Sequence, residues 1–218
     1  MFQTVVAVGC WGGLMFWAAG TLSWTRAWIH LGTWAATFIA NFFILFFANP
    51  AVLFARLKRQ RTEKKLDILL LTAVLPVTLA IPVTAGLDAV RMQWSSLPAW
   101  LIYPGFALHF IGNALVLWAM VVNPYLEKTV RIQTERGHRV ITTGPYAIVR
   151  HPMYLGVMVM LGAVPLFVGS LWTYVPLGLM WLLLVLRTSF EDRMLRNELP
   201  GYKEYTLVTR YRILPGIW

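Results

Sequence analysis

Residues 138–156 contain side chains that could take part in chemistry. Arg150 and His151 directly precede Pro152. Because proline is well tolerated in the first turn of a helix, the sequence predicts a helix that begins at Pro152. Free backbone N–H groups at a helix start, together with Arg and His side chains, favour an anionic group. The alternative is that Arg150 is an ordinary surface anchor and His151 an ordinary helix-start residue.

A second stretch, residues 187–198, alternates acidic and basic residues. Arg187 and Glu191 are four residues apart, and so are Asp192 and Arg196. This spacing places both members of each pair on one helix face. Arg187 beside Glu191 could receive a carboxylate or phosphate at a membrane boundary, although an ordinary ion pair is the alternative. We interpret Asp192–Arg196 as an ordinary pair on a solvated helix.

The composition restricts the class of protein that holds these stretches. Hydrophobic residues make up 58% of the 218 residues, charged residues only 13%, and the net charge is +10. Soluble domains have roughly 25% charged residues, so a water-soluble globule is excluded and an integral membrane protein is predicted. The single Cys10 excludes an intramolecular disulfide and a thiolate zinc cluster. We also expect no metal site, because His138 and His151 lie too far apart on a loop, and no nucleic-acid partner, because the basic loops need none to explain them.

Charge-free runs predict an all-α, polytopic membrane helix bundle with about six spans. Each run contains the ~20 residues needed to cross the hydrocarbon core. The predicted spans are 3–22, 27–48, 67–88, 99–122, 153–168 and 172–188. Gly169-Ser170 interrupts the last charge-free run, so we predict that the final two spans form a short helical hairpin. One long kinked helix is the alternative. His109 and Asn113 in the fourth span either hydrogen-bond a neighbouring helix, which we favour, or line a cavity.

The basic residues predict how the spans are oriented. Of 19 Lys and Arg residues, six fall in the 49–66 loop, five in residues 123–152 and six from residue 187 onward, and only Arg26 and Arg91 lie on the other side. Basic residues accumulate in cytoplasmic loops. We therefore expect both termini to be cytoplasmic.

Together these motifs resemble the isoprenylcysteine carboxyl methyltransferase family, particularly its short bacterial members. The resemblance covers roughly residues 113–218. It rests on Asn-Pro-Tyr at 123–125, Arg-Gly-His at 136–138, Gly-Pro-Tyr at 144–146, Arg-His-Pro at 150–152, Tyr154, Gly156, Glu191-Asp192, Leu195, Tyr202, Tyr205 and Pro215. The chain departs from the family at Asp192, where Glu is common, and at Leu199-Pro200-Gly201, which replaces a Phe-Gly turn.

The resemblance implies a multi-pass methyltransferase of the bacterial inner membrane that uses S-adenosylmethionine. It implies that residues 123–218 form the catalytic region and that residues 1–122 supply membrane helices without a recognisable motif. Arg187 and Glu191 match the family's basic and acidic positions beside the substrate. The implied cofactor-site residues are His138, Val140, Gly144, Pro145, Tyr146, His151, Pro152 and Tyr154, to which we add Arg150 from its place at the helix start.

The methyl acceptor is left open by the sequence. The resemblance implies a lipophilic or prenylated acceptor, with membrane lipids as surroundings. A carboxylate acceptor, with a pKa of roughly 4, needs no base. An amine, as in phospholipid N-methyltransferases, must first lose a proton, for which Glu191 is the candidate base. An NADPH enzyme resembling membrane sterol reductases and a non-enzymatic membrane protein are further alternatives.

Overall fold

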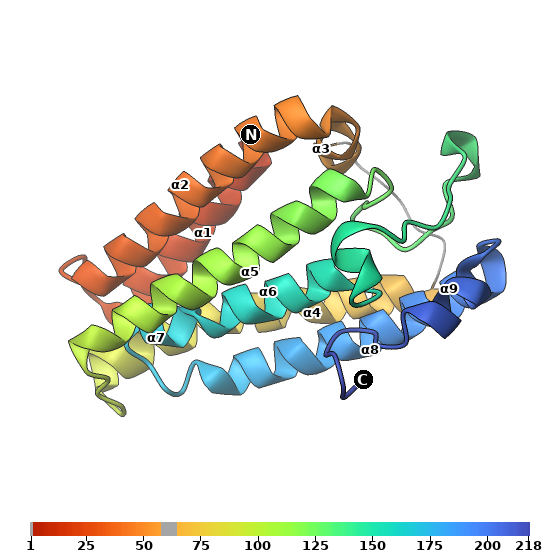
Figure 1. Cartoon of the computed structure of the whole chain (residues 1–218). Coiled ribbons are helices and arrows are strands. Elements are labelled where there is room, and N and C mark those ends of the chain that lie inside the picture. Colours follow the sequence, from red (N-terminus) through yellow and green to blue (C-terminus); the bar gives the residue numbers. More distant parts are fainter. Residues whose placement is uncertain (1, 58–64) are drawn as a thin grey trace. The chain divides into compact units, whose positions relative to one another are not determined.

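The computed structural model describes residues 2–57 and 65–218 and is all-α, as the sequence predicts. A π-helical turn at Leu87–Met92 follows α4, and a short 3-10 turn at Ala99–Leu101 leads into α5. The α-helices, coloured along the chain in Figure 1, are α1 (Phe2–Ala19), α2 (Thr25–Ala48), α3 (Pro50–Leu57), α4 (Lys65–Gly86), α5 (Ile102–Val122), α6 (Pro152–Gly162), α7 (Val164–Val168), α8 (Tyr174–Glu198) and α9 (Tyr202–Val208).

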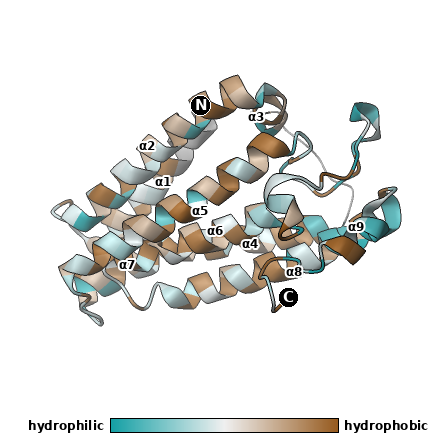
Figure 2. Ribbon diagram, in the orientation of Figure 1, coloured by the Kyte–Doolittle hydropathy of each residue, from teal (hydrophilic) through white to brown (hydrophobic). Residues whose placement is uncertain are grey.

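Four helical segments in the described part of the chain are long and apolar enough to cross a membrane. They are Thr25–Ala48, Lys65–Met92, Ala99–Val122 and Tyr174–Glu198. Val8–Ala19 and Pro152–Val168, the second made of α6 and α7, are shorter apolar segments. Figure 2 shows hydrophobic residues along α4 and α5 and hydrophilic residues around α9. The chain is therefore a multi-pass membrane protein. Of the basic residues predicted for the 49–66 loop, Lys58, Arg59, Arg61 and Lys64 lie outside the described residues.

The chain divides into two compact units, each assembled from three separate segments. Unit 1 comprises Met1–Ile39, Thr72–Ile111 and Met158–Leu182, and unit 2 comprises Ala40–Leu71, Gly112–Val157 and Leu183–Trp218. The chemistry-bearing stretches identified in the sequence fall mainly in unit 2.

In unit 1, the chain turns back after α7, as Gly169-Ser170 predicts. Gly169 adopts a left-handed φ of 83° and its N–H bonds to the Pro165 carbonyl at 2.9 Å, which ends α7. The Trp181 indole then donates to the Met158 carbonyl at 3.2 Å, so α8 lies against α6 (Figure 1). The alternative prediction, one long kinked helix in place of the hairpin, is thus wrong.

The predicted hairpin also needs two corrections. Its first arm is not continuous over 153–168, because it breaks at Ala163, where Pro165 has no N–H to continue the helical ladder. Its second arm is not short, because α8 continues to Glu198 over 25 residues.

Arg26, predicted to lie away from the other cations, closes a helix end in unit 1. Its Nε donates to the Phe167 carbonyl at 2.8 Å and its Nη2 to the Leu166 carbonyl at 2.5 Å. These carbonyls belong to the last turn of α7, which favours a cation. The third nitrogen, Nη1, donates to the Leu97 carbonyl at 2.9 Å.

Polar side chains of α2 and α5 pair between the helices, as predicted for His109 and Asn113. In unit 1, His109 Nε2 lies 3.0 Å from Thr37 Oγ1. In unit 2, Asn41 Nδ2 donates to Asn113 Oδ1 at 2.7 Å. Interhelical hydrogen bonds of this kind satisfy polar groups that hydrocarbon would not solvate.

Gly156 lets α6 approach α5 closely in unit 2. A Cβ built at Gly156 would lie 2.7 Å from the Gly112 carbonyl oxygen and 2.8 Å from the Val116 nitrogen, both backbone atoms. Gly156→Ala is therefore expected to lower the free energy of unfolding by roughly 1–3 kcal/mol, because the two backbones must separate. The matched control is Gly178→Ala in α8, where a Cβ would meet nothing within 4 Å. Thermal unfolding in detergent would measure both, and equal effects would contradict this packing argument.

Candidate functional site

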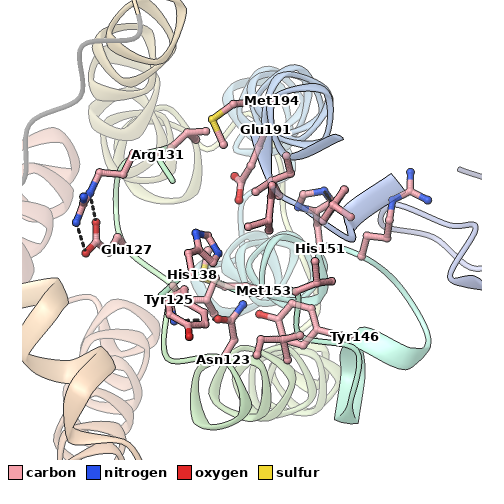
Figure 3. A pocket seen from close by; sticks show the side chains of 18 of the residues that line it. Asn123, Tyr125, Glu127, Arg131, His138, Tyr146, His151, Met153, Glu191 and Met194 are labelled. Atoms are coloured by element: carbon pink, nitrogen blue, oxygen red, sulfur yellow. Dashed lines mark hydrogen bonds and ion pairs between the residues drawn. The ribbon is translucent and has the colours of Figure 1, made fainter. Parts of the chain in front are cut away.

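Unit 2 contains a partly open pocket. Four segments form it: the loop after α5, the start of α6, the second half of α8, and α9 with the turn before it. Figure 3 shows His138, Tyr146 and Glu191 around this pocket. The predicted site residues that line it are His138, Val140, Tyr146, Arg150, His151, Pro152, Tyr154, Arg187 and Glu191.

Gly144 and Pro145, also predicted for the cofactor site, are not among the lining residues. They instead form the 3-10 turn Gly144–Ala147 that delivers Tyr146 to the pocket. Gly144 has a left-handed φ of 60°, and a Cβ there would lie 3.1 Å from the Trp118 indole nitrogen. The predicted helix start at Pro152 is confirmed, since α6 begins there.

Asp192 corrects one sequence interpretation. Its carboxylate lies 3.2 Å from Arg196, but it is fully buried and not part of a solvated helix face. The carboxylate accepts Arg150 Nε at 2.7 Å, the Tyr202 hydroxyl at 3.1 Å and Arg212 Nε at 3.0 Å. The sequence could not show this, because the start of α6, α9 and the following tail all converge on Asp192 from distant positions. Asp192 thus holds the wall of the pocket together.

The guanidinium of Arg150 is buried and forms hydrogen bonds with other groups of the protein. Besides Asp192, it bonds the Thr209 and Arg210 carbonyls at 2.9 and 2.6 Å through Nη1. The backbone N–H groups of Arg150 and His151 donate to the carbonyls of Tyr211 and Arg212 at 2.9 and 2.8 Å. The Arg150 guanidinium, expected to favour an anion at this helix start, therefore pairs with Asp192 and the C-terminal tail. Arg150 is therefore suited to positioning the tail.

Arg187 and Glu191 both line the pocket. Among the described residues, each side chain forms its hydrogen bonds with a different partner, and not with the other. Arg187 Nε lies 3.2 Å from Asp67 Oδ1, and Nη2 donates to the Lys128 carbonyl at 2.5 Å. Glu191 accepts the Tyr154 hydroxyl at 2.6 Å. The sequence interpretation missed Asp67. A lone acid beside an apolar run was the available signal, since such acids often have a specific partner.

The loop between α5 and α6 is held by ion pairs near the pocket. Glu127 accepts Arg131 Nε at 2.8 Å and Nη2 at 3.0 Å, drawn as dashed lines in Figure 3. Arg131 also pairs with Glu135 at 2.7 Å. Arg131, one of the basic residues that predicted the membrane orientation, therefore also holds the conformation of this loop. Pocket residues that the sequence interpretation did not single out as site residues include Asn123, Tyr125, Glu127, Tyr202 and Tyr205.

His138 projects from this loop into the pocket as a neutral ring. Its Nδ1 faces the Gln133 N–H at 3.3 Å, so in the neutral ring the proton is on Nε2. Burial is the main cause that lowers the pKa of His138. Burial likewise raises the pKa of Tyr205 to about 12, so this hydroxyl stays protonated and donates to the Tyr146 carbonyl at 2.6 Å.

The lowered pKa of His138 gives a pH prediction. Unfolded histidine has a pKa near ~6.5, so below that pH the unfolded chain binds more protons at this position than the folded protein. The contribution of His138 to stability is therefore present above pH ~6.5 and is lost as pH falls through the lowered folded pKa. NMR titration of the His138 ring should give a midpoint below ~6.5, and His138→Gln should reduce the acid sensitivity of unfolding. A midpoint at or above ~6.5 would contradict the burial of this ring.

The fold and the pocket define a class: a multi-pass, all-α membrane protein with a polar pocket near the end of α8. Residues 104–197, from α5 to α8, match the model of the isoprenylcysteine carboxyl methyltransferase (ICMT) family. The chain thus contains an ICMT family methyltransferase domain, and this family uses S-adenosylmethionine. Most of the pocket lining lies inside the match, whereas Leu199, Tyr202 and Tyr205 lie beyond it. A search of curated proteins found no match to the chain.

Proposed function

We propose that the protein transfers a methyl group from S-adenosylmethionine to a lipophilic acceptor at the cytoplasmic boundary of the membrane. One observation carries the proposal: a single pocket is lined both by cofactor-site candidates and by Arg187 and Glu191. We further propose that both termini are cytoplasmic, that about six segments span a bacterial inner membrane, and that residues 123–218 form the catalytic region.

The pocket residues suit S-adenosylmethionine, which when bound supplies an activated methyl group on a cationic sulfonium. Tyr146, Tyr154 and Tyr202 offer aromatic faces, which attract cations. Glu127 and Glu191 supply carboxylates, and His138 offers a donor at Nε2. Asp192 and Arg150 hold the C-terminal tail in place beside these groups. We propose that these side chains bind and orient the cofactor.

Arg187 is proposed to bind the acceptor carboxylate. Its partners Asp67 and the Lys128 carbonyl fix one edge of the guanidinium, so its remaining donors can pair with a carboxylate. Alignment of the two reactants is most of what methyl transfer requires. Because a carboxylate is already ionised at neutral pH, no side chain has to remove a proton. This favours a prenylcysteine-like carboxylate as acceptor.

An amine acceptor, as in a phospholipid, is the second candidate, and the Tyr154–Glu191 hydrogen bond of 2.6 Å favours it. Glu191 would accept the amine proton, with Tyr154 holding the carboxylate. Methyl transfer to a carboxylate should stay flat between pH 7 and 9, whereas transfer to an amine of pKa ~10 should rise up to tenfold per pH unit. Initial rates with each acceptor would distinguish them.

The test of the proposal is transfer of labelled methyl from S-adenosylmethionine to a panel of acceptors. The panel contains N-acetyl-S-farnesylcysteine, phosphatidylethanolamine and a small thiol, with the protein reconstituted in vesicles. We expect label on the farnesylcysteine. Label on none of the three, from a protein that unfolds cooperatively, would contradict the proposed acceptor class.

A further inference from the structure

Asp67 lies in the first turn of α4, outside the part of the chain that matches the family. The side chain is completely buried in unit 2. Its Oδ1 pairs with Arg187 Nε at 3.2 Å, and its Oδ2 accepts the backbone N–H of Val130 at 3.1 Å. The two oxygens of this buried carboxylate therefore have different partners: one pairs with α8 and the other with the loop after α5.

Arg187 itself completes this connection. Its Nη2 donates to the Lys128 carbonyl at 2.5 Å, two residues before the N–H that Asp67 accepts. Asp67, Arg187 and the segment 128–130 thus form a closed ring of hydrogen bonds. Thr129 and Val130 line the pocket, as does Arg187. The orientation of the arginine is consequently linked to the conformation of the loop.

The charge on Asp67 matters for this arrangement. The Arg187 side chain is 13% exposed and the Asp67 side chain 0%. A carboxylate that receives Nε fixes the plane of a guanidinium, which a neutral group holds more weakly. Among the described residues, the hydrogen bonds of Arg187 use Nε and Nη2, and Nη1 remains for an acceptor group.

We propose that Asp67 is the positioning residue for Arg187 and couples it to the 128–130 segment of the loop. Ordering of the loop by a bound cofactor then also sets Arg187 for the acceptor. The proposal rests on the proposed function only in assigning the acceptor carboxylate to Arg187.

The first test uses Asp67→Asn, which keeps the volume and an oxygen for the Val130 N–H but removes the charge. With N-acetyl-S-farnesylcysteine as the probe, the acceptor KM should rise at least about tenfold, since one partner of a buried charge pair is lost. The Kd for S-adenosylmethionine should rise clearly less than the acceptor KM, because the loop loses one hydrogen bond whereas Arg187 loses its charged partner. Glu204→Gln, an exposed acid on α9, is the matched control and should change neither quantity. Equal rises in acceptor KM and cofactor Kd would indicate a merely structural role and overturn the proposal.

The second test needs no acceptor. Hydrogen exchange of the 126–131 segment is compared in wild type, Asp67→Asn, Arg187→Gln and the double variant. Each single change should accelerate exchange, and the double variant should be no faster than the quicker single one, because both break the same ring. Unchanged exchange in Asp67→Asn, or additive acceleration in the double variant, would overturn the coupling. This result is independent of methyl transfer, so wild-type protein that methylates nothing would count against the proposed function alone.

Discussion

Replacing Arg150 by methionine is expected to lower the free energy of unfolding by about 3–5 kcal/mol, the cost of breaking a buried ion pair. The side chains of Arg150 and Asp192 are 2% and 0% exposed. The variant keeps apolar volume but leaves the Asp192 carboxylate and the Thr209 and Arg210 carbonyls without their shared donor. Cofactor affinity should fall as well, because the tail loses its attachment. Thermal unfolding in detergent and titration with S-adenosylmethionine would measure the two effects.

Arg193→Met is the matched control for this prediction. Arg193 lies beside Asp192 on α8 but is exposed. Surface substitutions usually change stability by less than about 0.5 kcal/mol. If the Arg150 and Arg193 variants unfolded at the same temperature, Asp192 would not be the centre of the pocket wall.

Arg187→Gln is expected to reduce methyl transfer to a carboxylate acceptor by about 100-fold or more, comparable to losing one donor that stabilises a reacting oxygen. S-adenosylmethionine should still bind, because the aromatic and carboxylate groups of the pocket remain. With the same acceptor, Glu191→Gln should have the smaller effect, since no proton has to be removed. The order of the two variants should reverse with an amine acceptor. Single-turnover rates at saturating cofactor measure the comparison.

Two outcomes would count against this assignment. Full activity in Arg187→Gln would exclude Arg187 from acceptor binding. A loss of cofactor binding that matched the loss of rate would mean that the substitution disturbs the pocket as a whole. Arg193→Gln, on the exposed face of the same helix, should behave as wild type in both measurements.

Local sequence patterns predicted much of the fold. Charge-free runs located the long helices because a hydrocarbon core tolerates few charges. Gly169 predicted the turn and Pro152 the start of α6, since each residue restricts the backbone at its own position. The break at Ala163 was not predicted, because a single proline in a short apolar run signals a break only weakly.

The contacts of the site depend on distant parts of the chain, and local spacing does not encode these. Asp192 and Arg196 have the spacing of an exposed pair, yet the tail at Arg212 and the helix start at Arg150 bury the carboxylate. Asp67 lies 120 residues before Arg187. The family resemblance identified Arg187 and Glu191, but their partners Asp67 and Tyr154 come from the first turns of α4 and α6, which unit 2 brings to the second half of α8.

Photochemical labelling tests most directly whether the pocket of unit 2 binds S-adenosylmethionine. The purified protein is irradiated with ultraviolet light in the presence of methyl-labelled S-adenosylmethionine, and the labelled peptides are identified by mass spectrometry. We expect label on residues 123–154 or 187–205, where the pocket aromatics lie, and competition by unlabelled cofactor. Competable label confined to unit 1, or no competable label at all, would contradict the account.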